Sequence, residues 1–373
     1  MKINIVWLKR DVRWHDHAVL RYAIDDRLPV ILLYLFEPSV MGVPESDIRH
    51  FRFAYQGLLD FTQKLGSQKA TILHAEAIDV YDSLKDQFEI QQVLSHQETG
   101  LEVTYRRDQA VRRWCRSNGV QWKTFGRDGV QRNLKDRTNW QDYWDSYMNA
   151  PLIDIDPRQL TIVSPEPYIF RKEWLNVPKP IKALNQNFQN GGESEALSLL
   201  SSFTKERAKD YLKNLARPAH SQDTCSRLSP YIAHGQISAR KVFQATQEVK
   251  QVLGKNIDQF HNRLWWRCHY IQKLETEYQI EKHPINRGFL ALKKPYRADY
   301  YHAWSTGSTG FPMIDASMRC LIDTGYLNFR MRAMLATFWS FTLWQDWQIG
   351  ATHLAKVFLD FEPGIHYPQF QMQ

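Results

Sequence analysis

The chain has 373 residues, of which 43% are hydrophobic and 24% are charged, so it can bury the core of one large domain or of two smaller ones. No apolar run approaches the roughly 20 residues that a helix needs to cross a bilayer. Residues 1–7 favour a first strand over a cleavable signal peptide. Composition therefore argues against a membrane protein and predicts a cytoplasmic one. Nothing indicates an oligomer, so we expect a monomer.

The formal net charge of +8 is unevenly distributed along the chain. Acidic and basic side chains balance in residues 1–200, whereas Lys and Arg outnumber Asp and Glu in residues 201–373. Such a distribution favours a polyanionic partner for the second half, most commonly nucleic acid; a merely basic surface is the alternative. The 13 Trp residues fit that partner because indole rings stack on bases, and they would equally serve electron transfer.

The four cysteines, Cys115, Cys225, Cys268 and Cys320, are far apart and form no C-x-x-C pair. Their spacing supports neither a zinc site, nor an iron–sulfur cluster, nor a disulfide framework. We expect reduced, mostly buried thiols and no metal.

Short apolar runs alternate with helical periodicity over residues 1–125. Five runs are predicted to be strands, at 3–7, 30–36, 71–74, 92–95 and 121–125. The alternation predicts an α/β domain with a doubly wound parallel sheet. The turn at residues 9–13 lacks the G-x-G-x-x-G pattern, and the chain has neither a P-loop nor a G-x-S-x-G elbow.

The remaining chain changes character twice. Residues 126–200 carry six prolines between Pro151 and Pro180, followed by Gly191 and Gly192, and are predicted to be a connector over the surface. Residues 201–373 show helical periodicity without strand patterns, and are predicted to be all-helical.

Residues 224–230 read Thr-Cys-Ser-Arg-Leu-Ser-Pro. A basic, hydroxyl-rich turn that opens a helix presents free backbone N–H groups and a guanidinium, which together suit a phosphate or diphosphate. An ordinary helix N-cap is the alternative, because Thr and Ser are favoured there whatever the function.

Four more segments follow this turn in order. They are residues 263–270 (RLWWRCHY), 304–316 (WSTGSTGFPMIDA), 325–332 (GYLNFRMR) and 360–366 (DFEPGIH). With the opening residues 7–13 (WLKRDVR), they resemble the cryptochrome/photolyase family over essentially the whole chain. The resemblance implies an α/β antenna domain over 1–125, a connector over 126–200 and a helical FAD-binding domain over 201–373. Relatives continue past the position of Gln373, so we expect this last domain to be truncated.

The resemblance assigns FAD-binding roles by position. The FAD phosphates would rest on the turn at 224–230, and Asp360 would face the flavin ring and pair with Arg332. The residues expected to bind FAD are Tyr211, Cys225, Ser226, Arg227, Leu228, Ser229, Phe260, Arg267, Arg332, Asp360, Glu362 and His366. A second, antenna chromophore of unknown identity would lie in the first domain. For single residues, a surface ion pair or an ordinary buried tyrosine is the alternative.

The same resemblance implies a site for damaged DNA. Trp266 matches the tryptophan against which the lesion packs in repair enzymes of the family, where a flipped-out dinucleotide is stacked. The residues expected to contact DNA are Trp265, Trp266, Trp304, Phe329 and Arg330, and those expected to take part in catalysis are Trp266, Arg263 and Trp347. Tryptophans of a helical core and a solvated basic face are the alternatives.

Several positions depart from the family pattern. Arg263 stands where dimer-repairing members usually carry glutamate, and Phe329 where many carry a polar residue. His366 stands where asparagine or aspartate faces flavin N5, and we expect it to exchange a proton near neutral pH. Three tryptophans usually reduce the flavin in this family, and only one of these positions is matched here, by Trp347. Trp339 and Trp344 would supply another route, or belong to the core.

The resulting hypothesis is light-driven repair of a pyrimidine dimer in DNA by an electron from reduced FAD. The alternative is a cryptochrome-like blue-light photoreceptor that binds FAD without repair, and a third is a light-insensitive remnant. The sequence leaves open the lesion type, the antenna pigment and the route of electrons to the flavin.

Overall fold

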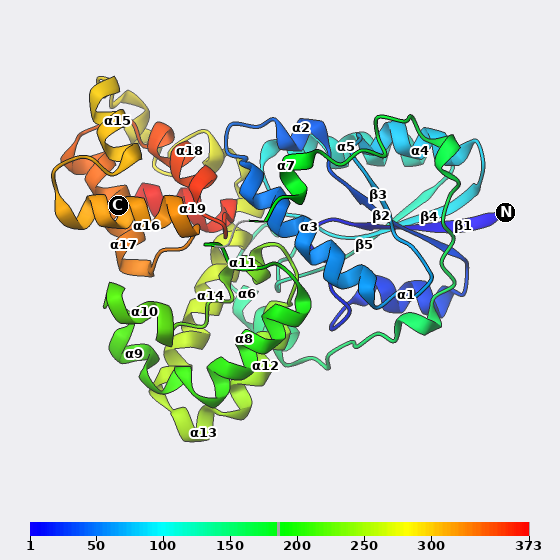
Figure 1. Cartoon of the computed structure of the whole chain (residues 1–373), viewed down its shortest axis with the longest axis horizontal. Helices are drawn as coiled ribbons and strands as arrows, with labels where there is room; N and C mark the ends of the chain where they lie inside the picture. The colour runs from blue at the N-terminus through cyan, green and yellow to red at the C-terminus, as the bar shows by residue number, and fades with distance from the viewer. Residues whose placement is uncertain (185–186, 373) are drawn as a thin grey trace.

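The computed structural model describes residues 1–184 and 187–372. A sheet flanked by helices lies at one end of the molecule, and two groups of helices lie at the other (Figure 1). The sheet has five parallel strands: β1 (Lys2–Leu8), β2 (Val30–Leu35), β3 (Thr71–Leu73), β4 (Glu89–His96) and β5 (Gln121–Phe125). Their order is β3-β2-β1-β4-β5, so the chain returns across β1 between β3 and β4. All five predicted strands are present, which confirms the doubly wound α/β domain.

The helices of the first 192 residues are α1 (Ala18–Asp26), α2 (Pro38–Met41), α3 (Ile48–Gln63), α4 (Ala77–Lys85), α5 (Glu102–Ser117), α6 (Trp140–Asn149) and α7 (Lys179–Lys182). The second half contains α8 (Glu193–Lys205), α9 (Tyr211–Asn214), α10 (Pro218–Thr224), α11 (Ser229–Ala233), α12 (Ala239–Glu248), α13 (Lys250–Leu253), α14 (Lys255–Thr276), α15 (Ala298–Thr306), α16 (Pro312–Thr324), α17 (Phe329–Thr337), α18 (Trp347–Val357) and α19 (Pro363–Met372). A π-helical turn, Phe338–Thr342, continues α17, and short 3-10 turns lie at Pro157–Gln159, Pro167–Ile169, Arg207–Asp210, Tyr278–Glu281 and Arg287–Ala291. Within 201–372 no residue is in a strand, which confirms the all-helical second half.

Helices cover both faces of the sheet. Because side chains alternate along a strand, Ile3, Ile5 and Trp7 of β1 join one apolar cluster and Val6 and Leu8 join the other. Residues of α4 and α5 complete the first cluster, and residues of α1 and α3 complete the second. Burial on both faces explains why these strands are nearly continuous apolar runs.

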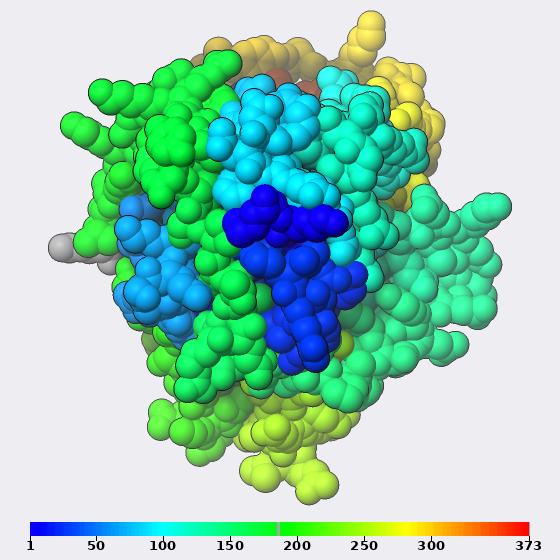
Figure 2. Space-filling model, turned by 90° about the vertical axis from the view of Figure 1, so that its right-hand side faces the viewer, coloured from blue at the N-terminus to red at the C-terminus, as the bar shows by residue number. Residues whose placement is uncertain are grey.

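The connector is more integrated than its prolines suggest. Its helix α6 places Trp140, Trp144 and Met148 in the core of the helical half, whereas Phe170 and Trp174 pack against the sheet. Figure 2 shows the end of the sheet domain, with connector residues (green) lying beside the N-terminal end of the chain (dark blue). The predicted connector therefore holds both halves together instead of lying only on the surface.

The helical half has two apolar clusters bridged by α14 (Figure 1). Phe260 and Leu264 of α14 belong to the cluster around α6, α8 and α12, and Leu274 belongs to the cluster around α15 to α19. No helix in the described ranges is both long and apolar enough to cross a membrane.

The two halves meet in a backbone contact between Gly235 and the loop after β1. Gly235 has φ +69, and a Cβ added there would lie 1.7 Å from the Arg10 carbonyl oxygen. Arg10 Nε donates to the Ala233 carbonyl at 2.8 Å, and Arg13 donates to the Gly235 carbonyl at 3.0 Å. Only glycine fits a turn that approaches another backbone this closely.

Candidate functional site

The turn at residues 224–230 joins the end of α10 to the start of α11. Arg227 adopts the left-handed conformation, with φ 60, which turns the backbone sharply before Ser229. Its Nε donates to Gln189 Oε1 at 3.1 Å, and Gln189 donates in return to the Arg227 carbonyl at 3.0 Å. Gln189 thus fixes the turn from the connector side.

Two guanidinium groups at this turn have no carboxylate partner among the described residues. Arg207 donates to the carbonyl oxygens of Leu199, Cys225 and Ser226, and Arg227 bonds only to Gln189. Burial and the neighbouring Arg227 lower the pKa of Arg207. Adjacent cations without a counter-ion are costly, so this arrangement favours an anionic ligand.

Arg332 and Asp360 form a bidentate ion pair next to the turn. Both guanidinium nitrogens of Arg332 donate to the Asp360 carboxylate at 2.8 Å. Burial would raise the pKa of Asp360, but Arg332 and the Ser229 hydroxyl lower it below its ordinary value. Arg332 keeps 27% of its side chain exposed, so one edge of the pair stays accessible.

Tyr326 brings the turn and this ion pair together. The guanidinium carbon of Arg227 lies 3.9 Å from the Tyr326 ring centroid, and that of Arg332 lies 5.9 Å from it. The Ser229 hydroxyl also reaches Asp360. Segments that are about 100 and 130 residues apart in sequence therefore meet in one positively charged site. These residues fit FAD, because the unpaired guanidinium groups match its diphosphate and the accessible Arg332 can face a negatively charged ring.

The apolar residues assigned to the same site are buried beneath it. Tyr211 and Phe260 pack edge to face with centroids 5.7 Å apart, and Leu228 is fully buried in the same cluster. Cys225 is buried beside them, and burial raises the pKa of its thiol. These side chains form the floor of the site.

His366 is the residue expected to face flavin N5. It is buried, and its Nε2 donates to the Ala351 carbonyl oxygen at 2.8 Å. Burial lowers the pKa of His366 to about 4. The imidazole is therefore neutral at neutral pH in the protein without a ligand. Proton exchange between His366 and a bound flavin stays a prediction.

Arg267 and Glu362 face the sheet domain and bond to charged partners. Arg267 lies 3.3 Å from Asp128 and 3.4 Å from Glu362, and Arg10 Nη2 donates to the same Glu362 oxygen at 2.8 Å. Arg267, Glu362 and Asp128 are all nearly buried. In this structure the ion pairs of both residues link the two halves.

Four of the five residues expected to contact DNA are at least partly exposed, and the fifth, Trp304, is buried. Trp266 is 39% exposed and stacks on Tyr270, and Trp265 packs edge to face against it at 5.0 Å. Arg263, one turn earlier on α14, lies over the Phe329 ring at 4.1 Å, and the exposed Arg330 lies 5.9 Å from the same ring. These five residues form an aromatic and basic surface.

Trp304 is a correction. It is completely buried and packs against Trp339 with ring centroids 4.8 Å apart, so it cannot stack on a base in this structure. The reason is the orientation of α15, which turns this residue towards the core of the α15 to α19 group. Trp347, the other tryptophan assigned by position, is half-buried, and its ring centroid lies 6.3 Å from that of Tyr367.

A cavity of about 160 Å³ lies where the carboxyl ends of β1, β2 and β4 meet the helical half. It is lined by Lys9 and Arg10 after β1, Phe36 and Glu37 after β2, Glu98 after β4, and Phe361 and Pro363 beside Glu362. Lys9 Nζ and Glu37 Oε1 are buried without a hydrogen-bond partner. Burial raises the pKa of Glu37 to about 7 despite the Arg107 guanidinium at 2.9 Å.

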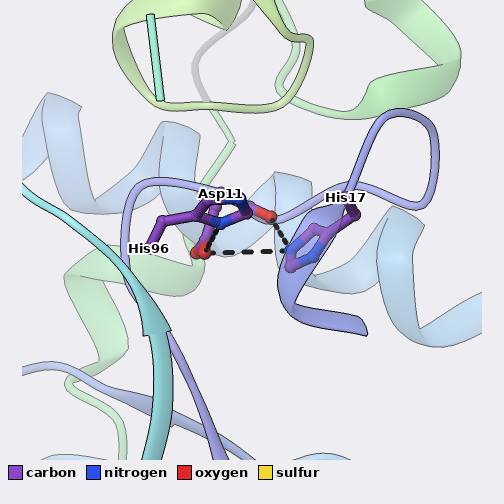
Figure 3. A group of neighbouring side chains, drawn as sticks. All are labelled: Asp11, His17 and His96. Atoms are coloured by element: carbon purple, nitrogen blue, oxygen red, sulfur yellow. Dashed lines mark hydrogen bonds and ion pairs between the residues drawn. The ribbon is translucent and has the colours of Figure 1, made fainter. Parts of the chain in front are cut away.

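Asp11, His17 and His96 form the one group in the described ranges whose ligand atoms are spaced as for a metal ion (Figure 3). Their hydrogen bonds already use those atoms. His17 Nδ1 accepts from the Leu20 N–H, so its Nε2 carries the proton and donates to the Asp11 carbonyl oxygen, while His96 Nδ1 donates to Asp11 at 2.7 Å. The group acts as a buried bridge between the β1 loop, α1 and β4.

Sequence reasoning missed Arg207, Tyr326, Gln189 and the cavity at the ends of β1, β2 and β4. Gln189 carried no signal, because its role depends on a contact across the fold. Tyr326 stood inside the segment 325–332, and Arg207 stood near Tyr211 in the half with excess basic charge, so position in that half was the available signal.

Residues 4–131 match the family model described as DNA photolyase, and residues 260–373 match the FAD binding domain of DNA photolyase. The chain belongs to the photolyase/cryptochrome family. It is 25% identical to the deoxyribodipyrimidine photo-lyase of Alkalihalophilus pseudofirmus over 97% of this chain and 78% of that protein. It is also 25% identical to cryptochrome DASH of Synechocystis over 96% of this chain and 78% of that protein.

Solved structures share the fold of this photolyase/cryptochrome family member. A class III photolyase from Agrobacterium tumefaciens superposes with a TM-score of 0.84 at 24% identity, over 100% of this chain and 79% of that one. An archaeal photolyase from Sulfolobus tokodaii, described as holding two FAD molecules, gives a TM-score of 0.79 at 22% identity, over 100% and 82%.

Proposed function

We propose that this chain binds FAD and repairs a pyrimidine dimer in damaged DNA under blue light. The observation that carries the proposal is the meeting of the unpaired Arg207 and Arg227 with the Arg332–Asp360 pair around Tyr326. When bound, FAD supplies absorption of visible light and a transferable electron. The chain supplies the site that orients it.

The turn would hold the diphosphate, because its guanidinium groups and the hydroxyl of Ser226 converge there. Arg332 would place a fixed positive charge near the flavin ring, and Asp360 would hold that guanidinium in position. His366, as a neutral imidazole whose Nε2 is engaged by Ala351, would offer Nδ1 as a hydrogen-bond acceptor.

The exposed Trp266, with Arg263, Phe329 and Arg330 around it, would receive the flipped lesion and its backbone. The basic excess of residues 201–373 supports this partner through attraction to phosphates.

A second chromophore would occupy the cavity at the ends of β1, β2 and β4. Lys9 Nζ and Glu37 Oε1, the two atoms without a hydrogen-bond partner, would bond to polar edges of a flat ring held against Phe36.

The experiment tests FAD binding first and repair second. Protein purified without flavin is titrated with FAD and followed by flavin fluorescence; the reduced, loaded protein is then illuminated with an ultraviolet-irradiated oligonucleotide, and restored thymines are counted. We expect saturable binding and restored thymines only in the light. Binding without repair of either dimers or (6-4) lesions would favour the photoreceptor alternative, which Arg263 at the usual place of glutamate also favours. Failure to bind FAD would refute both.

A further inference from the structure

A row of aromatic rings leads inward from the surface of the α15 to α19 group. Tyr296 is 54% exposed, and its ring centroid lies 6.4 Å from that of Tyr301. Tyr301 lies 5.9 Å from Trp339, which lies 4.8 Å from Trp304. Trp339 and Trp304 are fully buried. Neighbouring rings are therefore in contact or nearly so along the whole row.

The inner end of the row reaches His366. The Trp339 indole packs directly on the backbone of Gly350, where an added Cβ would lie 2.2 Å from the ring, and its N–H donates to the Asp346 carbonyl at 2.7 Å. The next residue, Ala351, accepts the hydrogen bond from His366 Nε2. One peptide unit and one hydrogen bond thus separate Trp339 from the residue that stands at the flavin-facing position.

The outer part of the row carries a proton acceptor. The Tyr301 hydroxyl lies 3.3 Å from His353 Nδ1, and His353 Nε2 is buried without a partner. His353 also lies 5.3 Å from Trp304 on α15, and the positive charges of Lys356 on α18 and Arg49 on α3 act on it. Burial lowers the pKa of His353 to about 4, so the imidazole is neutral at neutral pH and can accept a proton at Nδ1.

We propose that Tyr301, paired with His353, is a redox-active tyrosine that supplies electrons through Trp339 to light-excited flavin. The proposal rests on the proposed binding of FAD beside Asp360 and His366. Bound, light-excited flavin would supply a one-electron oxidant, to which Trp339 would give an electron, and an electron from Tyr301 would refill Trp339. The phenol O–H bond breaks as Tyr301 is oxidised, and its proton moves to His353 Nδ1. A small-molecule thiolate in solution then gives one electron to the tyrosyl radical and becomes a thiyl radical, and the proton returns from His353 to the phenol oxygen of Tyr301.

Trp344 is a weaker outer donor despite being 45% exposed. The Lys294 ammonium lies 4.4 Å from its ring centroid and donates to the Ser340 carbonyl beside it. A fixed cation over an indole stabilises the neutral ring and opposes its conversion to a radical cation. Tyr301 avoids this repulsion, because it loses a proton together with its electron.

The first test compares Tyr301→Phe with Tyr300→Phe in full-length protein loaded with FAD. Tyr300 is the adjacent residue on α15 but lies against Arg297 at the surface, so its variant is the matched control. Under blue light with excess thiol, we expect Tyr301→Phe to slow flavin photoreduction by about tenfold and Tyr300→Phe to leave it unchanged. In heavy water, flavin photoreduction should slow measurably in the unaltered protein and should not slow in Tyr301→Phe, because only the unaltered protein breaks the Tyr301 O–H bond.

The second test does not depend on FAD. The full chain without flavin is oxidised by a flash-excited ruthenium complex and frozen, and the radical is identified by electron paramagnetic resonance. We expect a neutral tyrosyl signal that Tyr301→Phe removes and that His353→Gln, which keeps a hydrogen bond but not the base, weakens. An unchanged signal in Tyr301→Phe, or unchanged photoreduction with FAD bound, would overturn the proposal. A loss of photoreduction in Trp347→Phe alone would instead assign the route to Trp347 and Tyr367. If FAD does not bind, the proposed function fails, and the radical signal still decides the role of Tyr301.

Discussion

Two groups of arginines in this molecule contrast in their partners. Arg10 and Arg267 lie between the halves and share Glu362, and Arg267 also contacts Asp128. Arg207 and Arg227 lie at the turn before α11 and have no carboxylate partner in the described part of the chain. Buried charges that are paired hold structure together, whereas adjacent unpaired ones leave free energy for a ligand to recover. The contrast therefore predicts that the first group stabilises the fold and that the second group binds the proposed ligand.

The largest effect should come from breaking the paired group. Arg267→Met leaves Glu362 and Asp128 buried with one cation fewer, so the free energy of unfolding should fall by about 3–5 kcal/mol. Urea unfolding of the flavin-free protein measures it. An unchanged midpoint would show that the ion pairs between the halves add nothing to stability.

Removing an unpaired arginine should give the opposite pattern. Arg227→Gln loses one charge-assisted contact to a diphosphate, so FAD affinity should fall about tenfold to a hundredfold. The flavin-free stability should stay the same or rise slightly, because repulsion with Arg207 is relieved. FAD titration and urea unfolding on the same preparation give both values. Lost stability together with normal affinity would contradict the division between the two groups.

The fall in the free energy of unfolding at acidic pH should depend on the histidines that are buried and neutral in the folded chain. The pKa of His366 is about 4 in the folded chain against an ordinary 6.5, so the unfolded chain binds one more proton between these values. Stability is complete above pH 6.5 and falls on acidification towards pH 4. His366→Asn should reduce that slope by about 1.4 kcal/mol per pH unit, and the exposed His302→Asn should not. Equal slopes in both variants would contradict the burial of a neutral His366.

The smallest effect is expected at an exposed pair. Arg297 contacts Asp299 at 2.6 Å, but both side chains are more than half exposed. Arg297→Ala should leave the urea midpoint unchanged within error, because solvent screens such pairs. A clear loss would mean that charge pairing alone, without burial, accounts for the stability attributed to the group around Arg267.

The sequence predicted those features that depend on local pattern or on motif spacing. Short, nearly continuous apolar runs predicted the five strands, and the resemblance to the family predicted that the turn, Arg332 and Asp360 would meet. It could not predict partners across the fold. Arg267 and Glu362 were assigned to FAD by position, yet each bonds to charges from the other half, which no local pattern encodes.

The error at Trp304 has a related cause. An indole in a helix is equally compatible with a stacking surface and with a core, and only the packing of α15 against Trp339 decides between them. Likewise, His366 could be placed by alignment, but its neutral state depends on burial and on the Ala351 carbonyl.

The contact of Gly235 with the Arg10 backbone has a consequence for light harvesting. With no side chain between them, the turn after α11 and the loop after β1 cannot slide past each other without separating. A pigment in the cavity beside Arg10 and a flavin beside Asp360 would then keep a constant separation and mutual angle. Dipolar energy transfer, which falls steeply with separation, would proceed at a single rate in every molecule of the population.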